Sequence, residues 1–325
     1  MQAVNFRYIL FFIIFSLFAY AKAAQTTDLY KAIKINKKKK VAAIITDNPD
    51  ALNKKIQYHS YPLLEALKLG KGEIAIYLLD LGAGVDIKDK NLGGTPMNIF
   101  VLNSYRMNFP VFKEILEKLL QKGADINSTN SDGKTPLGVV ISFAVTEKNL
   151  LTFKQKILSM LENGAEINPS DKNAAPILFP FLEGLARLKS GHAKSAIEIF
   201  PLLIDKGADI NALDKNSDTV LMKLFSISPN HLSTGDRIRI ADILLDKGVD
   251  INAVNDDKNT VLHVLLKDSY KKFGLNEKCI LAEYLIENGA KITSKNKKHE
   301  SPKSLSKKNK RLHKIVISTR KKKKK

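Results

Sequence analysis

The sequence is poor in the residues that build disulfide frameworks and metal centres. Of its 325 residues one is cysteine, Cys279, and none is tryptophan. A single thiol cannot form a disulfide within the chain, so the fold must be held by packing alone. The six histidines lack paired metal-ligand spacings, and neither a GxSxG nor an HExxH pattern occurs. We therefore expect no enzymatic activity, catalytic residue, cofactor, metal site or small-molecule substrate.

Long apolar runs are also scarce, and the one that occurs lies between Tyr8 and Tyr20. Arg7 precedes it, and Ala21-Lys22-Ala23 follows as a small-x-small cleavage site, which is the pattern of a secretory signal peptide. The run is shorter than the roughly 20 residues that span a bilayer as a helix. We expect residues 1–23 to be a signal peptide cleaved near Ala23, with retention as an anchor as the alternative.

Export would place the chain in the periplasm or outside the cell, including release into a host. The abundance of Lys, Asn and Ile, whose codons are AT-rich, favours a bacterial source.

The basic excess, a formal charge of +20, lies at the two ends of the chain. Residues 1–55 carry 10 basic and 3 acidic groups, residues 291–325 carry 16 and 1, and residues 56–290 carry 27 and 29. We expect the lysine runs at 37–40 and 320–325 to stay extended, with weak electrostatic contact between the C-terminal tail and an anionic surface. The last 35 residues contain no aromatic side chain for base stacking, so no specific nucleic-acid site is predicted.

A segment of the type LLxxGAxIN recurs six times at spacings of 41, 41, 43, 41 and 41 residues. Two apolar residues before a glycine are typical of a helix end, because glycine takes the left-handed C-cap conformation without steric cost. The six glycines are Gly82, Gly123, Gly164, Gly207, Gly248 and Gly289.

A second element precedes each copy and predicts a helix start. In Thr-Pro-Leu the threonine hydroxyl accepts an amide of the first helical turn, and proline fits the first helical position, where an N–H would lack a partner. The six occurrences begin at Tyr61, Thr95, Thr135, Ala175, Thr219 and Thr260.

These two elements, with turn signals such as Ser131-Asp132-Gly133-Lys134, resemble the ankyrin-repeat family over about residues 56–305. The resemblance implies an all-α ankyrin-repeat solenoid of about six clear helix-pair repeats in residues 56–290. Degenerate capping repeats are expected on both sides, in residues 24–55 with their basic segment and in residues 291–325 with the Lys-rich tail.

The interval from helix start to glycine is 21 residues in the first repeat and 28 to 32 in the later ones. Because both ends of the unit are kept, the extra residues must lie between them. Adding roughly one turn to each helix absorbs about seven residues without rotating its apolar face. We expect lengthened helices, with irregular excess at 189–193 and 229–235.

Two further signals are assigned to the framework. Asn127-Ser128-Thr129 matches a glycosylation acceptor, but the same asparagine recurs at Asn168, Asn211 and Asn252 and is interpreted as structural. His263 ends an element of the Thr-Pro-Leu-His type, where we expect a hydrogen bond near Thr260 instead of a catalytic role.

By the same resemblance, partner contacts would come from the turns between repeats and from the first helix of each pair. The turn residues are polar and differ between copies, and the alternative interpretation is that they are solvated loop tips. The candidate residues are Lys88, Asp89, Lys90, Asn91, Ser128, Asn130, Ser131, Lys134, Ser170, Asp171, Lys172, Asp214, Lys215, Asn216, Asn255, Asp256, Asp257 and Lys258.

The leading hypothesis is an exported, noncatalytic module that binds a protein partner of unknown identity. The alternative is an envelope-, membrane- or anionic-polymer-attaching protein that acts through its basic tails.

Overall fold

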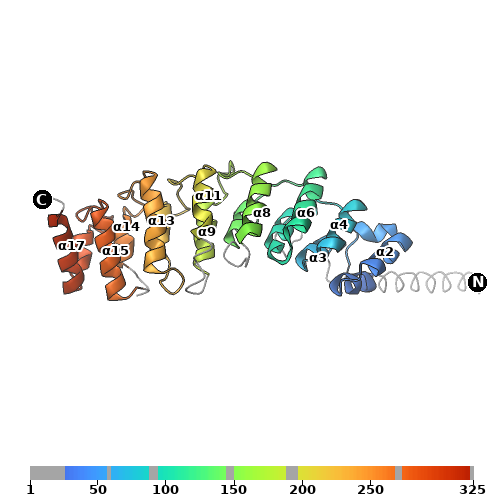
Figure 1. Cartoon of the computed structure of the whole chain (residues 1–325), viewed down its shortest axis with the longest axis horizontal. Helices are drawn as coiled ribbons and strands as arrows, with labels where there is room; N and C mark the ends of the chain where they lie inside the picture. Colours follow the sequence, from blue (N-terminus) through green and yellow to red (C-terminus); the bar gives the residue numbers. More distant parts are fainter. Residues whose placement is uncertain are drawn as a thin grey trace, which may run out of the picture. The chain divides into compact units, whose positions relative to one another are not determined.

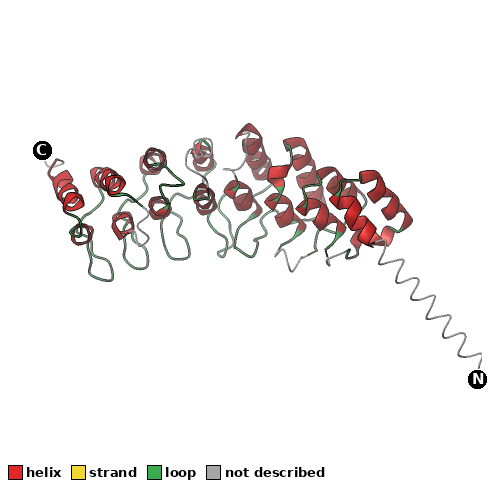
Figure 2. Ribbon diagram, turned by 90° about the horizontal axis from the view of Figure 1, so that it is seen from below, coloured by secondary structure: helices red, strands yellow, loops and turns green. Residues whose placement is uncertain are grey.

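The computed structural model describes residues 26–56, 60–87, 94–143, 150–187, 197–267 and 273–322. Across these ranges the chain is all-α with no strand, and an isolated bridge joins Leu213 and Thr219 (Figure 2). It divides into two compact units, Met1–Asp132 and Gly133–Lys325. Within the described ranges no helix has the length and apolar content needed to cross a membrane. The predicted signal peptide, residues 1–23, lies outside the described residues.

Helices of the first unit stack in pairs (Figure 1). Residues 26–34 are helical and precede α2. The first helix α3 packs on its partner α4 and on the next first helix α5, while α4 packs on α2 and α6. The bounds are α2 (Lys38–Asp47), η1 (Pro49–Asn53), α3 (Pro62–Lys68), α4 (Gly72–Asp80), α5 (Pro96–Leu102), η3 (Ser104–Arg106) and α6 (Phe109–Gln121).

The second unit continues the same pattern, because first helices pack on first helices and second helices on second helices. Along the first row α7 packs on α9, α9 on α12, α12 on α14 and α14 on α16; in the second row α13 packs on α15 and α15 on α17. The bounds are α7 (Pro136–Ser142), α8 (Leu150–Glu162), α9 (Leu178–Leu185), α11 (Ile199–Asp205), α12 (Val220–Ser226), α13 (Thr234–Asp246), α14 (Val261–Lys267), α15 (Leu275–Glu287), α16 (Pro302–Ser306) and α17 (Lys310–Lys322).

Threonine side chains cap three of the first helices. The Oγ1 atoms of Thr95, Thr135 and Thr219 accept the N–H three residues further on, at 3.4, 3.2 and 3.1 Å. Proline occupies the start of α5 and α7, where the absent N–H leaves no unpaired donor. The helix starts predicted from the Thr-Pro signature are confirmed at these positions.

Glycine closes the second helix of each of the six repeats. The φ angles of the six glycines lie between 85° and 100°, which is the left-handed region. In each copy the residue after the glycine donates its N–H to a carbonyl five positions earlier, as Ala83 does to Leu78 at 2.9 Å. This is the Schellman arrangement, and it satisfies carbonyls that the helix end would otherwise leave unpaired.

The predicted lengthening is found in four of the second helices and in none of the described first helices. Helices α6, α8, α13 and α15 have 13 residues, four more than the 9 of α4, whereas the described first helices of the repeats keep 7 or 8. The expectation that both helices grow was wrong. All seven residues of α7 are buried, and a Cβ on Gly184 of α9 would lie 2.7 Å from the carbonyl oxygen of Ser142. A first helix therefore has no free side on which to extend.

The remaining extra residues form longer connections between the two helices of a pair. Connections of six and seven residues, 103–108 and 227–233, replace the three residues 69–71 of the first repeat. The irregular excess predicted at 229–235 lies in such a connection and in the first turn of α13. The excess predicted at 189–193 lies outside the described residues.

Arg237 closes the connection between α12 and α13. Its side chain is wholly buried, and its guanidinium donates to the carbonyl oxygens of Leu224, Ile227 and Leu232, the last two at 2.7 and 3.3 Å. Burial lowers its pKa from 12.5 to about 10. The cation thus supplies donors to the end of α12 and to the loop that follows.

Both ends of the described chain are helical where lysine runs were expected to be extended. Lys38–Lys40 form the first turn of α2, which buries Val41 and Ile45, and residues 320–322 form the last turn of α17. The expectation was wrong for these residues for two physical reasons. Burial of the apolar face drives α2, and residues 320–322 continue a helix that has already formed, which costs less than starting one.

Candidate interaction surface

The turns between repeats are framed by side chains that accept backbone amides. In the turns that begin at Asp125, Asp209 and Asp250, the aspartate Oδ1 accepts the N–H two residues further on at 2.8 Å. This Asx turn fixes the course of the chain directly after the glycine.

Three asparagine side chains tie the chain of one repeat to the following repeat. Asn168 donates from Nδ2 to the carbonyl of Gly207 at 2.8 Å and accepts the N–H of Asp209 at 2.9 Å. Asn252 makes the same two bonds to the next repeat, at 3.1 and 2.8 Å. Asn53 does so in the first unit, at 3.5 and 2.9 Å. The structural interpretation of this recurring asparagine is confirmed for Asn168 and Asn252.

A second set of side chains shapes the tip of each turn. Each accepts the N–H two residues further on, at 2.8 to 3.1 Å. These residues are Asn130, Asp171, Asp214, Asn255 and Asn296. Four of them were candidates for partner binding, and the structure shows that their side chains are already engaged within the turn.

The candidate residues differ in their accessibility. Lys134 is buried, and its Nζ lies 2.6 Å from a carboxylate oxygen of Glu183. Ser128, Asn130, Asp214 and Asn255 are half-buried. Lys88, Asp89, Lys90 and Asn91 lie outside the described residues. The exposed candidates are Ser131, Ser170, Asp171, Lys172, Lys215, Asn216, Asp256, Asp257 and Lys258.

Two apolar side chains on neighbouring turns were missed by sequence reasoning. Leu213 is 48% exposed and Val254 is 49% exposed, and each lies six residues after a C-cap glycine. Asn255 donates from Nδ2 to Asp218 Oδ1 at 2.6 Å, which joins the two turns directly. The available signal was an apolar residue at the same place in two otherwise polar turns.

No family model matches the chain. A curated relative, the putative ankyrin repeat protein FPV228 of fowlpox virus (strain NVSL), is 32% identical over 125 residues, which are 34% of this chain and 23% of the viral protein. The match thus spans about a quarter of that relative's length.

Solved structures match a much larger share of the chain. The human ASB11 ankyrin repeat domain has a TM-score of 0.56 at 17% identity and covers 80% of this chain and 98% of its own. The ankyrin repeat domain of Bcl-3, a member of the IkappaB family, has a TM-score of 0.55 at 19% identity and covers 79% and 98%. The chain has the ankyrin-repeat fold. Over the 125 matched residues the chain is also similar in sequence to an ankyrin repeat protein.

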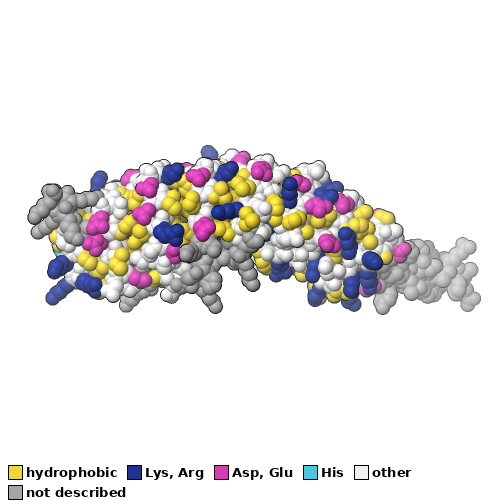
Figure 3. Space-filling model, in the orientation of Figure 1, with side chains coloured by type: hydrophobic (Ala, Val, Ile, Leu, Met, Phe, Trp, Pro, Cys, Tyr) yellow, Lys and Arg dark blue, Asp and Glu magenta, His cyan; other side chains and the backbone are white. Residues whose placement is uncertain are grey.

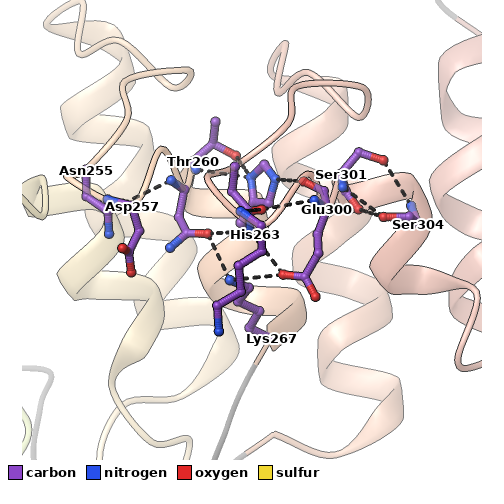
Figure 4. Close-up of polar contacts among 11 residues, drawn as sticks. Asn255, Asp257, Thr260, His263, Lys267, Glu300, Ser301 and Ser304 are labelled. Carbon is purple, nitrogen blue, oxygen red and sulfur yellow. Dashed lines mark hydrogen bonds and ion pairs between the residues drawn. The ribbon is translucent and has the colours of Figure 1, made fainter.

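Beneath the turns of the ankyrin array, His263 joins two repeats (Figure 4). Its Nδ1 accepts the N–H of Thr260 at 3.1 Å and lies 2.9 Å from the hydroxyl oxygen of the same residue. The other ring nitrogen, Nε2, must therefore carry the proton, and it donates to the carbonyl of Glu300 at 3.1 Å. Burial lowers the pKa of His263, which favours this neutral ring. The hydrogen bond predicted near Thr260 is confirmed.

An ion pair lies beside this histidine on the same two ankyrin repeats. Lys267 Nζ lies 3.3 Å from Glu300 Oε2 and donates to Asn259 at 3.1 Å, and Asn296 donates to both Asn259 and Glu300. The hydrogen bond from Asn296 and the Lys267 ammonium lower the pKa of Glu300. These contacts are all explained by the joining of repeats.

The rest of the ankyrin surface has charges of mixed sign. Acidic and basic side chains are interspersed over the second helices of the second unit (Figure 3). Among the described residues no group of three His, Cys, Asp or Glu side chains is placed to hold a metal ion. Large apolar side chains are also exposed elsewhere, among them Ile35 at 61% and Leu151 at 65%, but Leu213 and Val254 lie at the same place in two turns that a hydrogen bond joins.

Proposed function

We propose that the chain is a noncatalytic module that binds a protein partner through its ankyrin turns. The turn frames are fixed by repeated hydrogen bonds, so little conformational entropy is lost when a partner binds. The exposed tips differ between repeats, which provides a surface whose chemistry varies along the array.

The observation that carries the proposal is the apolar pair formed by Leu213 and Val254. Full burial of such a side chain stabilises by about 1.5 to 3 kcal/mol, so leaving half of each in water forgoes about 1 kcal/mol apiece. Protein interfaces consist of a mostly apolar centre surrounded by a polar rim. Exposed Lys215 and Asp256, one beside each tip, supply such a polar surround.

Site-specific photo-crosslinking at position 215 tests the proposal, because that side chain is exposed beside Leu213. The crosslinked protein is identified and purified, and its affinity is then measured for Leu213→Asp and Val254→Asp chains. We expect each substitution to weaken binding by about tenfold or more, since it places a carboxylate in a desolvated contact.

Ile280→Asp is the matched control, because Ile280 is 51% exposed but lies on the second helix α15. It should leave the affinity unchanged. Equal losses for Ile280→Asp and Leu213→Asp, or no loss for either turn substitution, would show that the turns do not form the interface.

Export is the second part of the proposal and rests on the N-terminal pattern of residues 1–23. We propose that the mature chain begins after Ala23 and acts in a bacterial periplasm or outside the cell. N-terminal sequencing of the protein from the producing cells tests this. An intact Met1 on protein recovered from the cytoplasm would refute it.

A further inference from the structure

The C-terminal capping repeat, here called the basic cap, consists of the turn at 290–301 with α16 and α17. Between residues 291 and 314, ten lysine and arginine side chains are exposed. Across residues 291–325 the only acidic residue is Glu300, which is paired with Lys267. Basic side chains gather beside α17 in Figure 3. This charge is therefore carried by a folded surface at the end of the ankyrin array.

Capping alone does not explain so much charge of one sign. A terminal repeat needs a polar outer face to stay soluble, and side chains of mixed sign provide it. The second helices of the same unit have mixed charges, as on α13, where Arg239 Nη1 lies 3.8 Å from Asp236 Oδ1. Mutual repulsion of ten cations destabilises the cap unless an anionic partner neutralises them.

The composition of the cap favours a lipid surface over a nucleic acid. Nine of the ten exposed cations are lysines, which act as hydrated point charges and lack the bidentate geometry by which arginine recognises phosphates and bases. No Phe, Tyr or Trp follows Tyr284, which leaves His299 and Arg311 as the exposed side chains of the cap that can stack on a base. Among the described residues of the cap, no large apolar side chain is exposed for insertion into a bilayer.

We propose that the basic cap docks the chain electrostatically on an anionic membrane surface. Buried Leu312 and Val316 attach α17 to the array, and exposed Lys314 on the same helix faces away from them. A cluster of four to eight cations beside a bilayer is the typical composition of such a contact. The residues of the basic cap are distinct from Leu213 and Val254, so the docking can be tested separately from the partner-binding turns.

The test measures binding of the full chain to vesicles of phosphatidylcholine mixed with phosphatidylserine, at about 0.1 M and about 0.5 M salt. The variant Lys303→Gln/Lys307→Gln/Lys314→Gln should bind about fivefold less per lysine, or roughly a hundredfold less in total. Binding of the unmodified chain should fall by about tenfold or more at the higher salt. Vesicles of pure phosphatidylcholine report any contribution from the apolar N-terminal run, which is the same in all variants.

Lys122→Gln/Lys206→Gln/Lys247→Gln is the matched control, because it removes the same total charge from exposed positions at the ends of α6, α11 and α13. Retained vesicle binding by this control supports the proposal, and equal losses in both triple variants would overturn it. Tighter binding of a short DNA duplex than of the anionic vesicles would overturn the assignment to lipid. Leu213→Asp should leave vesicle binding unchanged, which separates this test from that of the turn surface.

Discussion

Replacement of Arg237 by methionine tests whether a buried cation holds the connection between α12 and α13. The side chain has no exposed surface, and the guanidinium carbon lies 4.9 Å from the ring centroid of Phe273 and 6.0 Å from that of Phe225. Methionine fills much of the same volume with an apolar chain, so the substitution removes the charge and the donors while retaining most of the packing.

Two opposing contributions decide how much Arg237→Met changes the free energy of unfolding. Burial lowers the pKa of Arg237 from 12.5 to about 10, so holding the charge inside the fold costs about 3 kcal/mol. Removing the guanidinium leaves the carbonyls of Leu224, Ile227 and Leu232 without this donor, at about 1 to 3 kcal/mol each. The loss of three hydrogen bonds outweighs the gain from no longer burying a charge. We therefore expect Arg237→Met to be less stable than the unmodified chain by about 3 kcal/mol.

Urea unfolding combined with hydrogen exchange measures the effect locally, because repeat arrays do not unfold as one cooperative block. Amides of α12 and α13 should exchange faster in Arg237→Met. Arg239→Met is the control on the same helix, since that side chain is 57% exposed and only its 3.8 Å contact with Asp236 is lost. A variant as stable as the unmodified chain would show that desolvation of the charge fully offsets its hydrogen bonds and would refute the expected loss.

Three further predictions concern the turns and the contacts beneath them. Because burial lowers the pKa of His263 below 6.5, its unfolded form binds a proton more readily, so the free energy of unfolding should fall from about pH 7.5 to about pH 5.5. His263→Leu should reduce that dependence in urea titrations, whereas exposed His299→Asn should retain it. Lys258→Gly should raise the melting temperature, because a side chain at φ 57° costs roughly 1 kcal/mol, partly offset by the entropy of glycine. Asn252→Ala should lower the free energy of unfolding by about 1 to 2 kcal/mol and accelerate amide exchange at Lys291. Unchanged exchange at Lys291 would refute the role of Asn252 in joining the two repeats.

Helix starts and ends were predictable because their chemistry is local. Thr135 accepts the N–H of the residue three positions further on, and Gly123 adopts the left-handed conformation that its missing side chain allows. Neither feature requires knowledge of a neighbouring repeat. The recurrence of both elements was therefore sufficient to predict repeated helix pairs, and their resemblance to the ankyrin signature implied the ankyrin fold.

The division of the extra residues within a repeat was not predictable from intervals alone. The interval from helix start to glycine gives the total number of residues in two helices and their connection. Packing decides how many of these residues each helix and the connection contain. α7 is buried along its whole length, whereas α6 buries 4 of its 13 residues, so only a second helix has a free face along which to add a turn. The distribution of the extra residues follows from contacts between repeats, and the length of a sequence interval carries no information about those contacts.

The candidate surface was predictable in position but not in the use of each side chain. The 41- to 43-residue period located the tips, and the exposed residues Lys172, Lys215 and Lys258 lie there. Asp214 belongs to the same polar segment, but its carboxylate accepts the N–H groups of residues 216 and 218 at 2.8 and 2.9 Å. Aspartate and asparagine serve both turns and interfaces, so composition alone cannot separate the two roles.

Under the proposed function, the separation of these roles lets the array vary its partner without losing its fold. The bonds that fix a turn come from backbone groups and from a few Asn and Asp side chains, such as Asn168 and Asp214. Leu213 and Lys215 lie beside Asp214 in sequence, and both direct exposed surface to solvent. Their replacement leaves the frame bonds in place, so binding specificity can change at these positions while stability stays nearly constant.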